Sequence, residues 1–279
     1  MKMTIIVPTD FSLNARYAAE YACELANAKD YSIHLLHCYT SASVLDDDDP
    51  EPVEPTLKAD ELIQELKDEL MDLFPNLSIT LECSRSLIVE KLTELSHNND
   101  YGIIIMGASG ESQHKSVYYG STTLAVASKS EIPVLVIPNE PTKATAKQIA
   151  LLTNFKPEEL DTLKAYMKWI GEVDSLTLIH VFKDGQKQQN VEDTLNTWSF
   201  NIREMSSIGE VHSIAEQIHA EDDNLDTVPE VVYNVISKVN PDMILVTPSR
   251  KTFFERLFKP SVSKAIALEL SKPAFFEKV

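Results

Sequence analysis

The chain of 279 residues is 43% hydrophobic and 24% charged, so it is long enough to form one large or two ordinary soluble domains. Its net charge of −18 argues against nucleic acid as a partner, because phosphates need a basic counter-surface, and it disfavours anionic membrane surfaces. The apolar runs are too short to span a bilayer and the first residues show no signal-peptide pattern, so we expect a cytoplasmic protein without a membrane partner.

In chain order, short β-branched runs alternate with longer amphipathic stretches through the first half. We expect strands at 3–9, 32–38, 77–83, 102–107 and 133–137, and helices at 13–28, 57–73, 86–98 and 121–129. Several of the strands are apolar throughout, as parallel strands that are covered on both faces must be. This order predicts an α/β fold with a doubly wound parallel sheet, in which ligands bind at the carboxyl ends of the strands where the strand order reverses.

The second half repeats the first at a nearly constant offset, which predicts a tandem duplication. We therefore expect two Rossmann-like domains, 1–139 and 147–279, joined by a short polar linker. The corresponding pairs are VPTDFS (7–12) with LLTNFK (151–156), LLHCY (35–39) with LIHVF (178–182), YGIIIMGAS (101–109) with PDMILVTPS (241–249), and EIPVLVIP (131–138) with SKPAFFEKV (271–279).

Several polar residues indicate local structure. Ser12 can cap the first predicted helix. Ser213 and Glu216 have the spacing of a capping box, which predicts a helix start there. His37 and His180 occupy equivalent strand positions in the two halves, and we interpret them as packing residues.

The most informative stretch is MGASGESQHKSVYYGSTT, residues 106–123, because it holds three of the seven glycines of the chain. Gly107 and Gly110 directly follow an apolar strand, and Gly120 precedes a helical pattern that begins Ser-Thr. Glycine permits positive φ and close approach of the backbone, while exposed N–H groups and a helix N-terminus attract anions. The stretch therefore predicts a phosphate cradle and a bound nucleotide.

Other groups meet the glycines at the same edge of the predicted sheet. Asp10 ends the first strand, and its carboxylate can accept from an exocyclic amine or a ribose hydroxyl. The main chain around Cys38, at the end of the second strand, can supply adenine contacts. For each element taken alone the alternative is structural, because isolated glycines mark turns and Asp10 followed by Phe11 and Ser12 can simply cap a helix. The joint spacing favours a nucleotide site.

VPTDFS, the spacing G-x-x-G-x9-G-S and PVLVIP together resemble the universal stress protein family, in its ATP-binding branch. The resemblance implies two domains of the adenine nucleotide alpha hydrolase-like type that pair through their terminal strands as an intramolecular pseudo-dimer. It implies ATP or another adenine nucleotide as ligand, with Mg²⁺ or Mn²⁺ bridging the phosphates. Asp10 and the main chain near Cys38 would contact the base, and Gly107 the ribose. The implied binding residues are Pro8, Thr9, Asp10, Cys38, Met106, Gly107, Gly110, Gly120, Ser121 and Thr122.

The second half departs from this pattern at its decisive positions. Aligned without gaps, Thr247, Arg250, Pro260 and Asn154 stand where the first half has Gly107, Gly110, Gly120 and Asp10. Pro260 lacks a backbone N–H, and Thr247 and Arg250 carry side chains where the backbone would have to approach the ligand. We expect this degenerate domain to bind no nucleotide, which leaves one site per chain.

The chemistry beside the predicted cradle includes no evident general base or nucleophile. We therefore expect a sensor or regulatory module in the stress response rather than a dedicated enzyme. The alternatives are a ligand-independent scaffold for protein–protein contacts and an adenine-nucleotide-dependent enzyme such as a slow ATPase, and a homodimer of the whole chain stays open. Cys23, Cys38 and Cys83 lack C-x-x-C spacing and predict buried free thiols.

Overall fold

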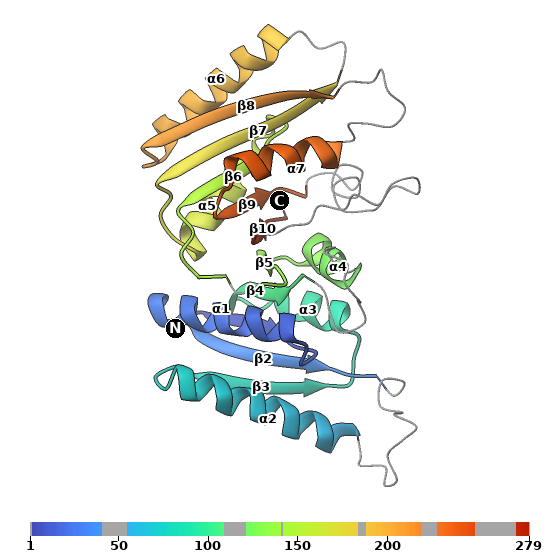
Figure 1. Ribbon diagram of the computed structural model, residues 1–279. Helices are drawn as coiled ribbons and strands as arrows, with labels where there is room; N and C mark the ends of the chain where they lie inside the picture. The colour runs from blue at the N-terminus through green and yellow to red at the C-terminus, as the bar shows by residue number, and fades with distance from the viewer. Residues whose placement is uncertain are drawn as a thin grey trace. The chain divides into compact units, whose positions relative to one another are not determined.

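The computed structural model describes residues 2–40, 55–108, 121–140, 142–183, 188–218, 228–248 and 272–278. The chain divides into two compact units, Met1–Ala144 and Thr145–Val279. Both units have the α/β fold with parallel strands that the sequence predicts (Figure 1). Across the described ranges, no helix is both long enough and apolar enough to cross a membrane.

The N-terminal unit is a doubly wound parallel sheet with the strand order β3-β2-β1-β4-β5. The order reverses at β1, which lies between β2 and β4. Helix α1 packs on β1 and β4, α2 packs on β2 and β3, and α3 contacts α4. The elements are β1 (Thr4–Pro8), α1 (Leu13–Lys29), β2 (Ser32–Cys38), α2 (Pro55–Leu73), β3 (Ile79–Ser84), α3 (Ile88–Ser96), β4 (Tyr101–Gly107), α4 (Ser121–Lys129) and β5 (Val134–Ile137).

Burial of apolar strands between the helices holds this unit together. The side chains of β1 and β4 that face the helices, such as Ile6 and Ile104, are fully buried, and burying one such side chain contributes about 1.5–3 kcal/mol. Helix α1 begins after Ser12, whose Oγ accepts a hydrogen bond of 3.2 Å from the Ala15 N–H, so the predicted cap is confirmed. The helix ends at Lys29, and the C-cap residue Asp30 adopts the left-handed conformation with φ 57°.

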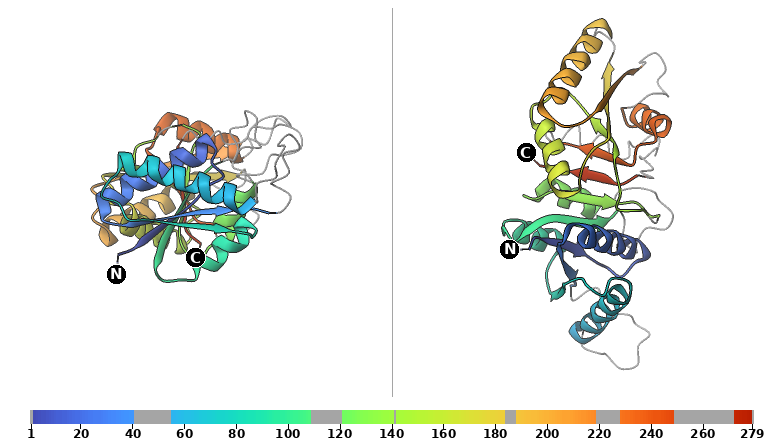
Figure 2. Two further views of the ribbon diagram at one scale, coloured as in Figure 1. Left: turned by 90° about the horizontal axis from the view of Figure 1, so that it is seen from below. Right: turned by 90° about the vertical axis from the view of Figure 1, so that its left-hand side faces the viewer.

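The C-terminal unit follows the same plan, with the strand order β10-β9-β6-β7-β8. Helix α6 packs on β8, while α7 packs on β7 and β8 from the opposite face of the strands (Figure 2, right). The elements are β6 (Gln148–Leu152), α5 (Glu158–Trp169), β7 (Ser175–Lys183), α6 (Gln188–Met205), β8 (Glu210–Ile218), α7 (Val228–Val239), β9 (Met243–Val246) and β10 (Ala274–Phe276). The expected pairing of the two domains through their terminal strands stays a prediction.

The expected helix start at Ser213 and Glu216 is wrong, because both residues lie within strand β8. Strand β8 pairs with β7 along its full length, and Ser213 lies opposite Leu178 in the register. The backbone hydrogen bonds of this ladder take the groups that a helix would use, so strand pairing overrides the local capping-box pattern.

All three cysteines are free, as predicted, but they differ in burial. Cys23 is fully buried in α1, whereas Cys38 and Cys83 are only half-buried. In the register of β2 and β3, Cys38 pairs with Ser84 and Cys83 pairs with His37. The thiols of Cys38 and Cys83 therefore point to opposite faces of the sheet.

Candidate functional site

The strand ends that carry the predicted nucleotide-binding residues meet at one edge of the N-terminal sheet. Asp10 follows β1, Cys38 ends β2, and Met106 and Gly107 end β4. Because β1 lies between β2 and β4 and all three strands are parallel, their carboxyl ends are neighbours. This edge includes the point where the strand order reverses, which is the usual position of a ligand in open α/β sheets.

A sharp turn after β1 presents Asp10 to solvent. The Nδ1 atom of His37 lies 2.8 Å from the carbonyl oxygen of Thr9, and the Phe11 N–H donates to Thr9 Oγ1 over 3.0 Å. The Phe11 ring lies 4.5 Å from the His37 ring, and Phe11 adopts a φ of 65°. His37 therefore holds the turn by a hydrogen bond as well as by packing, which the sequence interpretation missed.

Asp10 also takes part in the start of α1. Its Oδ1 atom accepts hydrogen bonds from the N–H of Ser12 over 3.1 Å and from the Ser12 hydroxyl over 2.6 Å. Ser12 in turn caps α1. The structural role that the sequence offered as an alternative is thus present, and it fixes the carboxylate of an exposed residue at the edge of the sheet.

Gly107 lies where α1 crosses close to the end of β4. A β-carbon at this position would be 2.7 Å from Asn14 Nδ2 and 3.1 Å from the Asn14 carbonyl oxygen. These separations are shorter than van der Waals contact, so any side chain here would force α1 or Asn14 to move. The packing of Asn14 is therefore a reason for glycine at position 107 in addition to the turn and the ligand approach that the sequence suggests.

The start of α4 is tied to the end of β4 by Thr123, a buried residue that the sequence interpretation also missed. Its hydroxyl donates to the carbonyl oxygens of Gly107 and Ala108, over 3.3 and 3.2 Å. Helix α4 begins at Ser121, and Thr122 is exposed beside it. The structure therefore brings the helix start to the strand end. The predicted phosphate residues Gly110 and Gly120 lie outside the described residues.

The Cys38 thiol does not have the environment of a nucleophile. Burial raises its pKa, and a hydrogen bond from Ser86 Oγ to Sγ over 3.6 Å opposes the shift only in part. Nearby, the Glu82 carboxylate lies 3.1 Å from His34 Nε2 and 2.8 Å from Lys91 Nζ. Burial opposes ionisation of Glu82, but these hydrogen bonds outweigh it and lower the pKa. Because the thiolate is the reactive form, the raised pKa argues against a nucleophilic role for the Cys38 thiol.

A small cavity of about 130 Å³ opens between the Thr9–Phe11 turn and helix α2. Arg16 lines it, and its guanidinium pairs with Glu69 and, over 3.7 Å, with Glu20. Small-molecule pockets usually measure about 300–1000 Å³, so this cavity alone is too small for a nucleotide.

The C-terminal unit contains the same strand-end turn. The Nδ1 atom of His180 lies 2.8 Å from the Thr153 carbonyl oxygen, and the Phe155 N–H donates to Thr153 Oγ1 over 3.0 Å. The Phe155 ring lies 4.4 Å from the His180 ring, and Phe155 has a φ of 62°. The duplicated turn is therefore part of the fold of both units and does not by itself indicate a ligand.

Beyond the turn, side chains of the C-terminal unit form hydrogen bonds at its own strand ends. The buried Glu159 carboxylate accepts from the Thr153 hydroxyl over 2.5 Å and from the Asn154 N–H over 2.7 Å. Thr247, which replaces Gly107, is hydrogen-bonded to Thr162. Arg250 and Pro260 lie outside the described residues. Within the described part of both units, no three histidine, cysteine or acidic side chains form a cluster that could hold a metal.

Comparison with known proteins relates the sequence and the fold to one family. The sequence model of the universal stress protein family matches residues 1–138. A universal stress protein of Methanocaldococcus jannaschii is 27% identical over 155 residues, covering 49% of this chain and 95% of that protein. The solved structure of a universal stress protein from Archaeoglobus fulgidus matches 99% of this chain and 96% of its own with a TM-score of 0.65 at 18% identity. A protein of unknown function from Pseudomonas aeruginosa matches 99% of this chain and 92% of its own, with a TM-score of 0.58 at 14% identity.

Proposed function

We propose that the N-terminal domain, residues 1–139, binds ATP or another adenine nucleotide, because residues 1–138 match the sequence model of the universal stress protein family. Binding would occur at one site per chain. The protein would act in the stress response as a sensor or regulatory module whose state depends on the bound nucleotide, rather than as a dedicated enzyme.

The observation that carries this proposal is the meeting of three strand ends and a helix start where the strand order reverses. Asp10 and the main chain at Cys38 would bind the base, and Gly107 would lie along the ribose. Residues at the helix start and in the preceding stretch would bind the phosphates. The complete proposed set is Pro8, Thr9, Asp10, Cys38, Met106, Gly107, Gly110, Gly120, Ser121 and Thr122.

Electrostatics at the start of α4 supports binding of an anion by a protein with a strongly negative net charge. The first N–H groups of a helix lack intrahelical partners and carry partial positive charge, so they stabilise a phosphate without lysines. Thr123 anchors this helix start to the carbonyls of Gly107 and Ala108, which would keep the N–H groups near the strand ends. Mg²⁺ or Mn²⁺ would enter with the nucleotide, held by its phosphates.

For the second domain, residues 147–279, we propose that no nucleotide binds. The Glu159 carboxyl accepts the hydrogen bond of the Asn154 N–H at the end of β6, so this N–H is not available to a phosphate. Thr247 puts a buried side chain where the first domain has Gly107. A phosphate at this edge would contact the side chains of Glu159 and Thr247 instead of free backbone N–H groups.

Substitution of Asp10 tests the base end of the proposed site. Asp10→Asn keeps an oxygen that can accept from Ser12 but removes the charge, so α1 should stay capped while ATP affinity falls about tenfold or more. Asp72→Asn, an exposed change at the far end of α2, is the matched control and should bind ATP as the wild type does. Calorimetry with ATP and Mg²⁺ measures both. Equal affinities for the two variants would contradict the proposed role of Asp10.

A further inference from the structure

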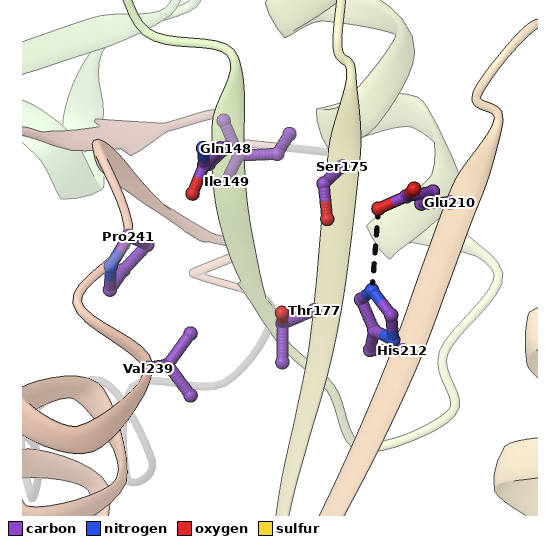
Figure 3. A pocket seen from close by; sticks show the side chains of 8 residues that line it. All are labelled: Gln148, Ile149, Ser175, Thr177, Glu210, His212, Val239 and Pro241. Atoms are coloured by element: carbon purple, nitrogen blue, oxygen red, sulfur yellow. Dashed lines mark ion pairs between the residues drawn. The ribbon is translucent and has the colours of Figure 1, made fainter.

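A second cavity, of about 320 Å³, opens in the C-terminal unit at the amino-terminal ends of β6, β7 and β8 (Figure 3). It lies at the opposite end of the strands from the edge where nucleotides are proposed to bind in this fold. Ser175 and Thr177 of β7 form its floor, and Glu210 and His212 of β8 form one wall. Its volume is at the lower end of the range of about 300–1000 Å³ that small-molecule pockets occupy.

Polar groups with unused hydrogen-bonding capacity line this cavity. The hydroxyls of Ser175 and Thr177 have no hydrogen-bond partner within the described part of the chain, although Thr177 is only 8% exposed. The His212 Nε2 atom lies 3.7 Å from Glu210 Oε2, which is longer than a hydrogen bond. Hydroxyls that open into a cavity can donate to and accept from a polar molecule that enters it, so the floor of the cavity suits such a molecule.

The same place in the N-terminal unit holds the packed side chains of His34, Thr80 and Tyr101. There the His34 ring lies 5.5 Å from the Tyr101 ring, and His34 Nδ1 lies 3.0 Å from Thr80 Oγ1. In the C-terminal unit the threonine and the histidine stand on exchanged strands, and Pro241 replaces the large ring of Tyr101 beside the cavity. The equivalent residues are Thr177 for His34, His212 for Thr80 and Pro241 for Tyr101, and both Thr–His pairs are cross-strand neighbours in the register.

We propose that this cavity binds a small, neutral, polyhydroxylated molecule of the class of monosaccharides and cyclic polyols. Each ligand hydroxyl both donates and accepts, and so do the Ser175 and Thr177 hydroxyls. Val239 and Pro241 form an apolar wall that suits the C–H face of a ring. The lining contains no lysine or arginine among the described residues, and Glu210 repels anions, so a phosphate does not fit.

The proposal is tested by titrating the full chain with myo-inositol, D-glucose and inorganic phosphate while following the His212 imidazole protons by NMR. A His212→Gln variant assigns the signal. We expect a saturable shift with at least one of the two polyols and none with phosphate. The highest polyol concentration, about 50 mM, lies well above the dissociation constant expected for a few hydrogen bonds. Absence of a saturable shift with either polyol up to this concentration would overturn the proposal. A shift with phosphate alone would overturn it as well.

A variant that copies the packed side chains of the N-terminal unit provides the second arm of the test. Thr177→His combined with Pro241→Tyr should fill the cavity and weaken polyol binding at least about tenfold. Ser175→Ala should weaken it about twofold to tenfold through one lost hydrogen bond. Ser213→Ala is the control, because this exposed residue of β8 points to the other face from His212. If the double variant does not fold, Ser175→Ala against Ser213→Ala decides, and equal polyol affinities would overturn the proposal.

Discussion

The hydroxyls of Thr162 and Thr247 lie 2.6 Å apart in the interior of the C-terminal unit. This hydrogen bond ties helix α5 to the end of β9, at the position where the N-terminal unit has Gly107. Both threonines are buried, so the polar pair is satisfied internally. The two domains therefore share the strand-end turn but differ at one position after it. Gly107 would let a ligand approach the backbone, whereas Thr247 places a side chain there.

Alanine at Gly107 should destabilise the N-terminal unit by about 1–3 kcal/mol, because its β-carbon would lie 2.7 Å from Asn14 Nδ2. Asn14→Ala in the same chain should recover part of the lost stability, because it removes the side-chain amide that the new β-carbon would contact. Gly209→Ala is the control, since a β-carbon there has no neighbour within 4 Å, and it should change stability by no more than about 0.5 kcal/mol. Urea unfolding measures all three, and equal effects of the two glycine substitutions would contradict the packing argument.

Truncation of Glu159 should destabilise the C-terminal unit by about 1–3 kcal/mol, because Glu159→Ala leaves the Thr153 hydroxyl and the Asn154 N–H without their acceptor. Glu159→Gln should cost less, since its amide oxygen can still accept from Asn154. Glu172→Ala, an exposed change in the same unit, serves as the control. Denaturant unfolding measures the stability of the three variants. A glutamine variant that is less stable than the alanine variant would contradict the proposed role of the Glu159 hydrogen bonds.

Acid should destabilise the C-terminal unit through His180. Burial lowers the pKa of His180 below its ordinary value of 6.5, although the hydrogen bond with the Thr153 carbonyl acts in the opposite direction. Between 6.5 and the lowered pKa the unfolded chain binds more protons than the folded one, so the free energy of unfolding falls as the pH decreases through this window.

His180→Asn removes the titrating ring and places a polar group near the position of Nδ1. The variant should therefore lose part of the difference in unfolding free energy between about pH 7.5 and about pH 5.5. Unfolding at the two pH values in wild type and variant measures this difference. An unchanged pH dependence would show that other groups carry it.

Most of the fold of the first half can be predicted from the sequence because its apolar, β-branched runs are separated by amphipathic stretches. The strand expected at 32–38 and the helix expected at 121–129 have these same bounds in the structure. Strand β8 could not be predicted in this way, because Ser213 and Glu216 satisfy a local helix signal and only the pairing with β7 decides against it. Local patterns do not record such long-range pairing.

For the candidate site, the positions of the residues can be predicted from the sequence, but the contacts that hold them cannot. The positions of Asp10 and Gly107 at neighbouring strand ends follow from strand order alone. The contacts that hold them do not: His37 reaches the Thr9 carbonyl from another strand, and Thr123 reaches back to the end of β4. The sequence does indicate the turn through its internal repeat, since the histidine and the phenylalanine of the first half have the counterparts His180 and Phe155 in the second half.

The proposal of one nucleotide site per chain is tested most directly by calorimetric titration of the full-length protein with ATP and Mg²⁺. We predict saturable binding with a stoichiometry of one ATP per chain, lost on disruption of the N-terminal strand ends and unaffected by Thr247→Ala. A stoichiometry of two would contradict the proposal that the second domain binds no nucleotide. Absence of binding at about millimolar ATP would contradict the nucleotide site itself.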